Sequence, residues 1–453
     1  MKNLKGRHIT IIGAARSGLA AARLLQSRGA EVFVSDHSRL KEAARESLRR
    51  SQIQFEEMKH STRAKEADLV IVSPGVPDQV PIMQHYREAG TPVYSELEVA
   101  SWYNKSPVIA VTGSNGKTTV TRWLAHVWET AGRPCLLAGN IGRAFSDVVD
   151  QTGPETTVIL EVSSFQLDYI DRFCPEVGLL LNITPDHLDR YENRFDLYAD
   201  AKMRISENQR PEHLLLYNAD DPKIADQVET LRKRGDGPRL LSWSSRKELA
   251  EGAFIRNNEL IVNINQTEEV IMTTDEIGLP GTHNLNNGLA TALAARVSEI
   301  KNETIRESLQ SFEGVEHRLE PVAEIEGVRY INDSKATNIN AAWFALDSFN
   351  VPMVLILGGR DKGNNWLALA DQLREKAHTV VAIGEARPAI LEQLDGVVPN
   401  LLEAESMKDA VRMAAGVARR GEIVLLSPAC ASFDMFDDYE QRGDEFKKSV
   451  LEL

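Results

Sequence analysis

The sequence lacks several features that would assign it to a specialised protein class. Its three cysteines, Cys135, Cys174 and Cys430, are an odd number without C-x-x-C spacing, which argues against a disulfide framework and a cysteine-built metal site. Aromatic residues are only 6%, and no stretch approaches the roughly 18 to 20 uninterrupted apolar residues of a membrane span. Positive charge is also in deficit, since 52 Lys and Arg face 66 Asp and Glu, giving a net charge of -14 without a long basic run. We therefore expect a soluble cytoplasmic protein that binds no nucleic acid and inserts in no membrane.

The length and the hydrophobic pattern favour an α/β protein with several domains. The 453 residues correspond to roughly three domains. Short β-branched runs alternate with longer helix-like stretches, the pattern of parallel sheets flanked by helices. We predict a Rossmann-like N-terminal domain over 1–95, a central P-loop-type ATPase domain with a mainly parallel sheet over 96–314, and a Rossmann-like C-terminal domain over 315–453.

Strands are expected where the β-branched runs occur, with a helix over 17–28 after the first. The expected strands are 8–12, 31–36 and 68–74 in the first domain, 107–111, 157–162, 177–182, 213–217 and a hairpin over 260–272 in the second, and 328–331, 353–357, 379–383 and 422–426 in the third.

A glycine-rich run after the strand 107–111 predicts a phosphate-binding loop. Gly113, Ser114, Asn115, Gly116, Lys117, Thr118 and Thr119 combine a strand end, a turn and a helix start. Backbone N–H groups in such a turn converge on an anion, and the helix N-terminus adds about half a positive charge. Lys117 is expected to reach the β- and γ-phosphates and Thr118 to ligate Mg²⁺. The strict pattern requires glycine where Val111 stands, so the alternative is a plain glycine turn.

A second glycine turn lies near the N-terminus. Gly13 and Gly18 fit the frame G-x-G-x-x-G, but Ala15 replaces the glycine that lets a backbone approach a pyrophosphate. This substitution makes a nicotinamide dinucleotide less favoured than another phosphate-bearing ligand. Asp36 follows the second strand, where a ribose or base would lie, and Gly75 belongs to a further loop at the same edge. A structural βα turn is an equal alternative.

Two further strand ends carry metal-binding residue types. Glu161 closes one strand and His187 follows the next, and both ends open on the edge that carries the phosphate loop. A carboxylate and an imidazole can meet the Mg²⁺ of a bound nucleotide there, although such residues are often structural. Lys202 lies on a following helix, and the residue pattern alone does not distinguish it from a solvated lysine.

These segments together resemble one enzyme family. The segments that carry the resemblance are 111–119 (VTGSNGKTT), 160–167 (LEVSSFQL), 182–191 (NITPDHLDRY), 281–284 (GTHN), 316–319 (EHRL), 332–338 (NDSKATN) and 426–434 (LSPACASFD). In this order they are similar to the Mur ligase family, and the second, fifth and last look most like its D-glutamate-adding members. The resemblance implies an ADP-forming amide ligase of peptidoglycan synthesis that joins D-glutamate to UDP-N-acetylmuramoyl-L-alanine through an acyl phosphate, acting as a cytoplasmic monomer.

The resemblance also implies roles for individual residues. Lys117, His187 and Lys202 are expected to be catalytic. Thr118, Glu161, His187 and a carbamylated Lys202 are expected to hold two Mg²⁺ ions. ATP is assigned the phosphate loop together with Asn284, Asn287, Arg318, Asp333 and Lys335. The UDP substrate is assigned Arg16, Ser17, Asp36, His37, Ser38, Gly75, Asn140 and His187. D-Glutamate is assigned Thr337, Lys362, Ser432 and Phe433.

Other interpretations stay open at this point. The acceptor could be a different amino acid, as in another Mur ligase, or the chain could be a folate-polyglutamylating relative. A nucleotide-gated binding protein would use the same phosphate loop as a switch, and a dehydrogenase has only the altered N-terminal glycine turn in its favour. Among single residues, the asparagine pair could cap a helix, Lys362 could be a loop cation and Ser432 could satisfy local backbone.

Overall fold

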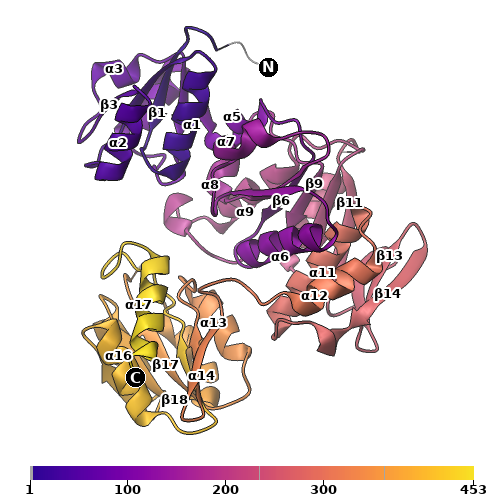
Figure 1. Ribbon diagram of the computed structural model, residues 1–453, viewed down its shortest axis with the longest axis vertical. Helices are drawn as coiled ribbons and strands as arrows, with labels where there is room; N and C mark the ends of the chain where they lie inside the picture. Colours follow the sequence, from indigo (N-terminus) through magenta and orange to yellow (C-terminus); the bar gives the residue numbers. More distant parts are fainter. Residues whose placement is uncertain (1–3, 234, 362) are drawn as a thin grey trace. The chain divides into compact units, whose positions relative to one another are not determined.

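The structure is a computed structural model that describes residues 4–233, 235–361 and 363–453. These residues form three sheets and divide into two compact units (Figure 1). The first unit runs to Glu276 and resumes over Asn286–Gln310; the second contains Ile277–Leu285 and Ser311–Leu453. The predicted three-domain α/β fold is confirmed, with two of its sheets in the first unit and one in the second.

The N-terminal sheet is parallel, in the order β3-β2-β1-β4-β5. Its strands are β1 (His8–Ile12), β2 (Glu31–Ser35), β3 (Gln54–Glu56), β4 (Leu69–Val72) and β5 (Val93–Ser95), and its helices are α1 (Arg16–Ser27), α2 (Glu42–Arg50), α3 (Thr62–Lys65), α4 (Pro81–Ala89) and α5 (Glu96–Ser101). The strand order reverses between β1 and β4, and ligands of such sheets bind at that point, outside the carboxyl ends of the strands.

The central sheet has the order β14-β13-β12-β11-β10-β9-β6-β8-β7; it is parallel from β7 to β12, and the pairings β12–β13 and β13–β14 are antiparallel. Its strands are β6 (Val108–Thr112), β7 (Cys135–Gly139), β8 (Thr157–Glu161), β9 (Val177–Leu180), β10 (Leu214–Asn218), β11 (Arg239–Ser244), β12 (Gly252–Arg256), β13 (Glu259–Ile264) and β14 (Thr267–Thr273). Its helices are α6 (Lys117–Thr130), α7 (Phe145–Val148), α8 (Ser164–Leu167), α9 (Phe195–Met203), α10 (Pro222–Arg232), α11 (Thr282–Val297) and α12 (Asn302–Ser311). β6 lies between β8 and β9, so the loops that follow these three strands open on one edge.

The third sheet has the order β15-β16-β20-β17-β18-β19 and is parallel except for β15. Its strands are β15 (Glu320–Ile325), β16 (Val328–Asn332), β17 (Met353–Gly358), β18 (Ala377–Ile383), β19 (Asn400–Glu403) and β20 (Ile423–Leu426), and its helices are α13 (Ile339–Asp347), α14 (Ala370–Lys376), α15 (Arg387–Leu394), α16 (Met407–Val417) and α17 (Tyr439–Leu451). Short 3-10 helices cover Val149–Gln151, Leu188–Arg190, Arg204–Ser206, Thr274–Glu276 and Trp366–Leu369.

Apolar side chains join the first two sheets into the first unit. One buried cluster contains Leu25 of α1, Leu97 of α5, Phe145 of α7 and Leu160 of β8. Leu25, Leu97 and Phe145 are each 0% exposed, and burying a side chain of this size contributes about 1.5 to 3 kcal/mol. The cluster therefore fixes the N-terminal cavity described below relative to the phosphate loop.

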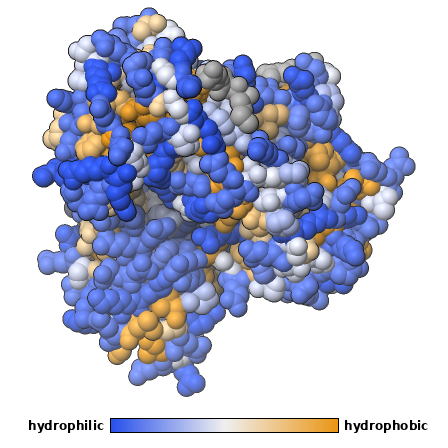
Figure 2. Space-filling view, turned by 45° about the horizontal axis from the view of Figure 1, so that its top comes forward, coloured by the Kyte–Doolittle hydropathy of each residue, from blue (hydrophilic) through white to orange (hydrophobic). Residues whose placement is uncertain are grey.

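One face of the molecule is mostly polar. Figure 2 shows hydrophilic residues over most of the visible face, with hydrophobic residues gathered in separate groups. Within the described ranges, no helix is both long enough and apolar enough to cross a membrane.

Candidate active site

The phosphate loop lies where the sequence predicts it, between β6 and α6. Gly116 has φ +83° and precedes the first helical residue, Lys117. The backbone N–H groups of Ser114 and Asn115 donate to Asn182, to its backbone oxygen at 2.9 Å and its side-chain oxygen at 2.8 Å. The Nζ atom of Lys117 donates to the carbonyls of Gly113 and Ser114, at 2.7 and 2.8 Å. The loop is thus held in shape by the strand end after β9 and by its own lysine.

Thr118 and Glu161 form the centre of the predicted metal site. The Thr118 hydroxyl donates to Oε2 of Glu161 at 2.6 Å, and the Asn140 side-chain amide donates to Oε1 at 2.7 Å. Both Thr118 and Glu161 are buried. A hydroxyl and a carboxylate side by side are the hard oxygen donors that Mg²⁺ prefers, so the residue set fits that ion.

Lys202 is buried beside the phosphate loop. Its Nζ atom donates to the Gly113 carbonyl at 2.9 Å and lies 4.5 Å from the ring centroid of Tyr198. The pKa of Lys202 lies well below its ordinary value, chiefly because the amine is buried and secondarily because the Lys117 cation is nearby. The structure thus separates Lys202 from solvated helix lysines, a distinction that the residue pattern could not make.

His187 adopts a left-handed backbone conformation with φ +52°. Its Nε2 atom lies 3.6 Å from Oδ2 of Asp186, and its ring packs edge-on against Phe165 with centroids 5.2 Å apart. Its side chain is 41% exposed. His187 is not among the residues that line the N-terminal cavity.

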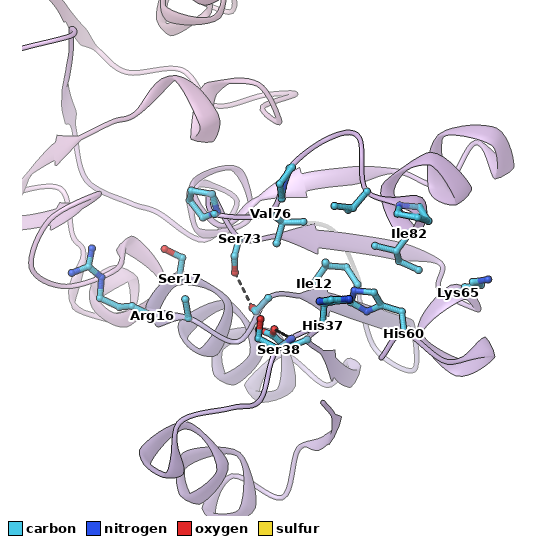
Figure 3. A pocket seen from close by; sticks show the side chains of 18 of the residues that line it. Ile12, Arg16, Ser17, His37, Ser38, His60, Lys65, Ser73, Val76 and Ile82 are labelled. Atoms are coloured by element: carbon cyan, nitrogen blue, oxygen red, sulfur yellow. Dashed lines mark hydrogen bonds between the residues drawn. The ribbon is translucent and has the colours of Figure 1, made fainter. Parts of the chain in front are cut away.

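A cavity of about 770 Å³ opens at the strand-order reversal of the N-terminal sheet (Figure 3). All the residues predicted for the UDP substrate except His187 line it: Arg16, Ser17, Asp36, His37, Ser38, Gly75 and Asn140. The Arg16 guanidinium donates to the Asn140 carbonyl at 2.6 Å. The structure therefore brings one residue of the central domain to the cavity of the N-terminal domain.

Asp36 and Ser73 hold the N-terminal glycine turn. The Asp36 carboxylate accepts from the backbone N–H groups of Ala14 at 2.7 Å and Ser38 at 2.8 Å. The Ser73 hydroxyl donates to the Gly13 carbonyl at 2.8 Å. A Cβ atom on Gly18 would lie 2.0 Å from that same carbonyl oxygen. Both glycines are thus required by packing, and the turn is at once a structural βα turn and a cavity wall.

The asparagines predicted for ATP lie in the first turns of α11. Asn284 donates to the Pro280 carbonyl at 2.7 Å, so its amide stabilises the chain entering the helix. Asn287 contacts the phosphate loop, since a Cβ atom on Gly116 would lie 2.6 Å from its Oδ1 atom. Both side chains are buried.

In the second unit, Asp333 and Arg318 lie together at the carboxyl ends of β16 and β20. The Asp333 carboxylate accepts two hydrogen bonds, from the Ser427 hydroxyl at 2.8 Å and from the Leu319 backbone N–H at 3.3 Å. Burial raises the pKa of Asp333 to about 6, and Arg318 opposes that shift. The Nε atom of Arg318 is buried without a hydrogen-bond partner in the described part of the chain. Lys335 donates to the Tyr439 hydroxyl at 3.3 Å.

The residues predicted for D-glutamate differ in exposure. Ser432 is buried, Thr337 is exposed, and Phe433 is 62% exposed. Lys362 lies outside the described residues.

Arg442 joins two of the motif segments of the second unit. Its guanidinium donates to the Ser334 hydroxyl and carbonyl, at 3.0 and 2.7 Å, and to the Cys430 carbonyl at 3.0 Å. Arg442 is 1% exposed, and it connects the segments 332–338 and 426–434.

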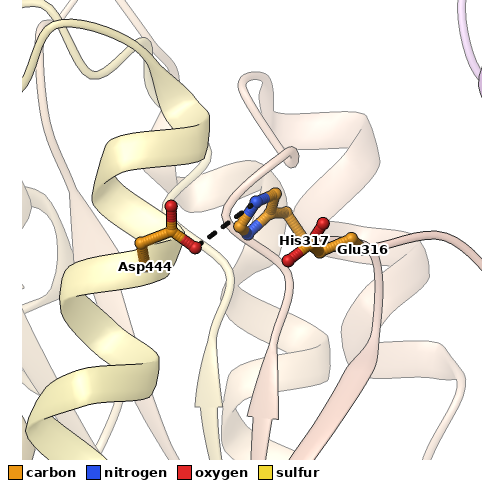
Figure 4. Close-up of side chains that lie close together, drawn as sticks. All are labelled: Glu316, His317 and Asp444. Atoms are coloured by element: carbon orange, nitrogen blue, oxygen red, sulfur yellow. Dashed lines mark ion pairs between the residues drawn. The ribbon is translucent and has the colours of Figure 1, made fainter.

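Glu316, His317 and Asp444 form the group of potential metal ligands found among the described residues (Figure 4). Lys447 forms ion pairs with both carboxylates of the group, with Glu316 and, at 3.1 Å, with Asp444. His317 is buried and its Nδ1 atom lies 3.0 Å from Nδ2 of Asn332. Because an ammonium already neutralises these carboxylates, the group functions as an ion-pair network that attaches α17 to the loop before β15.

Sequence reasoning missed several residues at these sites. The Tyr198 hydroxyl lies 3.0 Å from the Ser114 hydroxyl in the phosphate loop. His60 and Lys65 line the N-terminal cavity. Tyr198 occurs in the segment that contains Lys202, so the resemblance could have identified it. His60 and Lys65 belong to no motif, and neither the hydrophobic pattern nor the residue spacing indicates a role for them.

Comparisons with known proteins agree with this geometry. Three family models match: "MurD N-terminal domain" over residues 8–80, "Mur ligase middle domain" over 111–295 and "Mur ligase, glutamate ligase domain" over 317–430. A UDP-N-acetylmuramoylalanine--D-glutamate ligase of Salinibacter ruber is 46% identical over 449 residues, covering 98% of this chain and 97% of that protein.

Two solved structures share the fold. The UDP-N-acetylmuramate-alanine ligase of Thermotoga maritima has a TM-score of 0.63 at 20% identity and covers 98% of this chain and 99% of that chain. The MurF ligase of Thermotoga maritima in complex with ADP has a TM-score of 0.59 at 16% identity and covers 86% of this chain and 91% of that chain.

Proposed function

The chain belongs to the Mur ligase family, and from that premise we propose that it joins D-glutamate to UDP-N-acetylmuramoyl-L-alanine with the conversion of ATP to ADP and phosphate. The reaction builds the peptide of peptidoglycan. The D-glutamate ligase of Salinibacter ruber, similar over nearly the whole of both chains, supports the choice of acceptor.

The observation that carries the proposal is the position of Asn140. Its side-chain amide donates a hydrogen bond to Glu161 beside the phosphate loop, and its backbone carbonyl accepts one from Arg16 at the wall of the N-terminal cavity. A nucleotide sugar in that cavity therefore has its diphosphate near Arg16 and its acyl end directed toward Thr118 and Glu161. Transfer of a phosphoryl group from ATP to that acyl end requires this proximity.

Two buried donors of the phosphate loop support ATP binding. The Thr119 hydroxyl and the Asn115 side-chain amide are buried without hydrogen-bond partners in the described ranges. Buried donors are normally satisfied, so these two fit a bound phosphate chain. Thr118 and Glu161 would hold Mg²⁺, with His187 and Lys202 at a second ion, and bound magnesium neutralises charge on the transferring phosphoryl group.

A carbamate on Lys202 completes the proposed metal site. A neutral amine, the form that burial favours here, attacks CO₂, forms an N–C bond and releases one proton. The product is an anionic oxygen ligand, which suits a position beside Mg²⁺ better than an ammonium does. The resemblance assigns this modification, and the burial of Lys202 beside Gly113 supports it.

The proposed chemistry has two steps. The alanyl carboxylate attacks the γ-phosphorus and ADP leaves; the neutral amine of D-glutamate then attacks the acyl carbon, phosphate leaves and the amine loses a proton. Lys117 stabilises the charge that develops on the phosphoryl oxygens. The resemblance assigns Arg318, Asp333 and Lys335 to the nucleotide, and the Nε donor of Arg318, buried without a partner in the described ranges, is consistent with an anionic ligand. Thr337, Lys362, Ser432 and Phe433 are assigned to D-glutamate.

We further propose that the chain acts as a monomer in the cytoplasm. The phosphate loop, the N-terminal cavity and the Asp333 site all belong to this one chain. Light scattering coupled to size-exclusion chromatography measures the oligomeric state directly.

The proposal is tested by phosphate release with UDP-N-acetylmuramoyl-L-alanine, ATP and one candidate amino acid at a time. We expect release with D-glutamate and a ligated product by mass spectrometry. Release with L-alanine, a diamino acid or a folate substrate instead would assign the chain to another ligase of this fold. ATP hydrolysis without any acceptor would indicate a nucleotide-gated binding protein.

A further inference from the structure

His60 lines the N-terminal cavity, and a chain of hydrogen bonds through Ser35 fixes its ring. Its Nδ1 atom lies 2.7 Å from the Ser35 hydroxyl, and that hydroxyl donates to Oε1 of Glu56 at 2.7 Å. The Ser61 backbone N–H donates to the same carboxylate oxygen at 2.8 Å. Ser35, at the centre of this chain of hydrogen bonds, is 0% exposed, so its hydroxyl is shielded from water.

The direction of these bonds determines the tautomer of His60. Burial alone would raise the pKa of Glu56, but the bonds from Ser61 and Ser35 hold it below its ordinary value. The ionised carboxylate only accepts, so it takes the single Ser35 hydroxyl proton. The Ser35 oxygen is then an acceptor for His60, which must carry its proton on Nδ1. The other ring nitrogen, Nε2, keeps a lone pair and has no hydrogen-bond partner in the described ranges.

The charges around His60 leave the ring neutral near pH 7. Burial lowers its pKa, Glu56 opposes that shift, His37 adds to it and Asp36 opposes it. A neutral imidazole with Nδ1–H presents a hydrogen-bond acceptor at Nε2.

The second imidazole at this end of the cavity leaves no room for a base between the two rings. The rings of His37 and His60 have centroids 6.2 Å apart and are tilted by 40°. A flat base between two rings needs two contact gaps, about 7 to 8 Å in total. A base therefore cannot be sandwiched between His37 and His60, and the Nε2 lone pair, which lies in the ring plane, is offered to a ligand at the edge of the His60 ring.

The base of a nucleotide sugar belongs at this end of the cavity. Arg16 and Asn140 lie at the end that leads to Glu161, and His37, His60 and Ile82 lie at the other end (Figure 3). If the diphosphate lies at Arg16 and the acyl end extends toward Glu161, the base lies beside His60.

We propose that His60 selects the pyrimidine of the nucleotide substrate, accepting at Nε2 a hydrogen bond from the imide N3–H of uracil. This inference rests on the proposed function, which supplies a UDP substrate. Cytosine has a lone pair at N3, so its acceptor would face the acceptor of His60 and no bond would form. The site thus rejects cytidine nucleotides by an unmatched polar pair, which discriminates more strongly than shape.

Calorimetric titration of the full chain with UDP and with CDP tests the proposal. We expect the unmodified chain to prefer UDP, and His60→Ala to weaken UDP about tenfold, the loss of one hydrogen bond, with CDP unchanged. His60→Gln offers an acceptor to uracil N3–H or, with its amide turned, a donor to cytosine N3, so UDP binding should largely recover while the preference over CDP is lost. His8→Ala is the matched control, because His8 begins β1 at the opposite end of the strand and its side chain is 66% exposed.

The outcomes separate this inference from the proposed function. Equal loss of both nucleotides in His60→Ala, or no loss of UDP, would overturn the role of His60. In the ligase assay the variant should raise KM for the UDP substrate about tenfold with kcat unchanged. If the unmodified chain selects UDP through His60 yet releases no phosphate with D-glutamate, the proposed acceptor is wrong and the His60 inference stands.

Discussion

The side-chain amide of Asn140 donates a 2.7 Å hydrogen bond to Glu161. Thr118 uses the other oxygen of the same carboxylate, so the two bonds fix the Glu161 plane from both sides. An outer residue that orients a metal ligand typically changes affinity or activity by about 10- to 100-fold when it is removed.

Asn140→Ala should therefore lower kcat by about 10- to 100-fold and raise the magnesium concentration required for half-maximal phosphate release. The measurement is phosphate release as a function of Mg²⁺ concentration. Asn263→Ala, on β13 at the hairpin, serves as the control and should leave the magnesium dependence unchanged. An Asn140→Ala variant with normal magnesium dependence would show that Glu161 needs no orienting partner.

Lys202→Arg should reduce activity by about 100-fold or more, since a guanidinium keeps a positive charge and forms no carbamate. The carbamate itself is observed by NMR after incubation of the unmodified chain with ¹³C-labelled CO₂, and its signal should be lost in the variant. A full-strength signal in Lys202→Arg would place the modification on another lysine.

Gly116→Ala should weaken ATP binding at least tenfold. Its φ is +83° and the new Cβ atom would lie 2.6 Å from Asn287, so the loop or α11 must shift. Gly132→Ala, just beyond the other end of α6, is the matched control: its φ is +65°, but nothing lies within 4 Å of a Cβ atom there. Both variants incur backbone strain of about 1 to 2 kcal/mol, and ATP titration should distinguish them. Equal ATP affinity in both variants would show that the close packing of Asn287 against Gly116 does not affect ATP binding.

Glu96→Gln should change how stability depends on pH. Burial raises the pKa of Glu96 to about 7 from an ordinary value of 4.5. Between these values the folded chain holds a proton that the unfolded chain has released, so stability falls as pH rises through that window and levels off above it, by about 3 kcal/mol in total. The glutamine keeps an acceptor for the Ser146 N–H and cannot ionise.

Thermal unfolding at about pH 5 and about pH 8 measures this difference. The variant should lose less stability than the unmodified chain on going to the higher pH. Glu46→Gln, which replaces an exposed carboxylate on α2, should follow the unmodified chain. Parallel curves for Glu96→Gln and the unmodified chain would contradict a raised pKa.

The sequence predicted the central strands because they are buried on both faces. β1, β6, β17 and β20 consist mostly of buried apolar residues in one uninterrupted run, a pattern that loops lack. β3 and β5 were not predicted, because each is three residues long and only partly buried. Such edge strands form through pairing with a neighbour that is already in place, and no local pattern is required.

The candidate site shows the same division. Glycine turns, strand ends and the phosphate-loop lysine could be predicted, because each lies a fixed number of residues from a strand end or a helix start. His60 could not be, because it lies in the loop after β3 and reaches the cavity only through the strand order β3-β2-β1. The double role of Asp36, a cavity wall whose carboxylate is held by backbone donors, also depends on contacts between distant segments.

Arg442 has a consequence for any attempt to redirect the enzyme to another amino acid. Its one guanidinium bonds both the segment that holds Asp333 and Lys335 and the segment that holds Ser432. Substitutions near Ser432, which is assigned to D-glutamate, will therefore be transmitted to the residues assigned to ATP. A change of acceptor selectivity therefore requires that both loops be exchanged together with α17. Mutating either loop separately would disturb the other through Arg442.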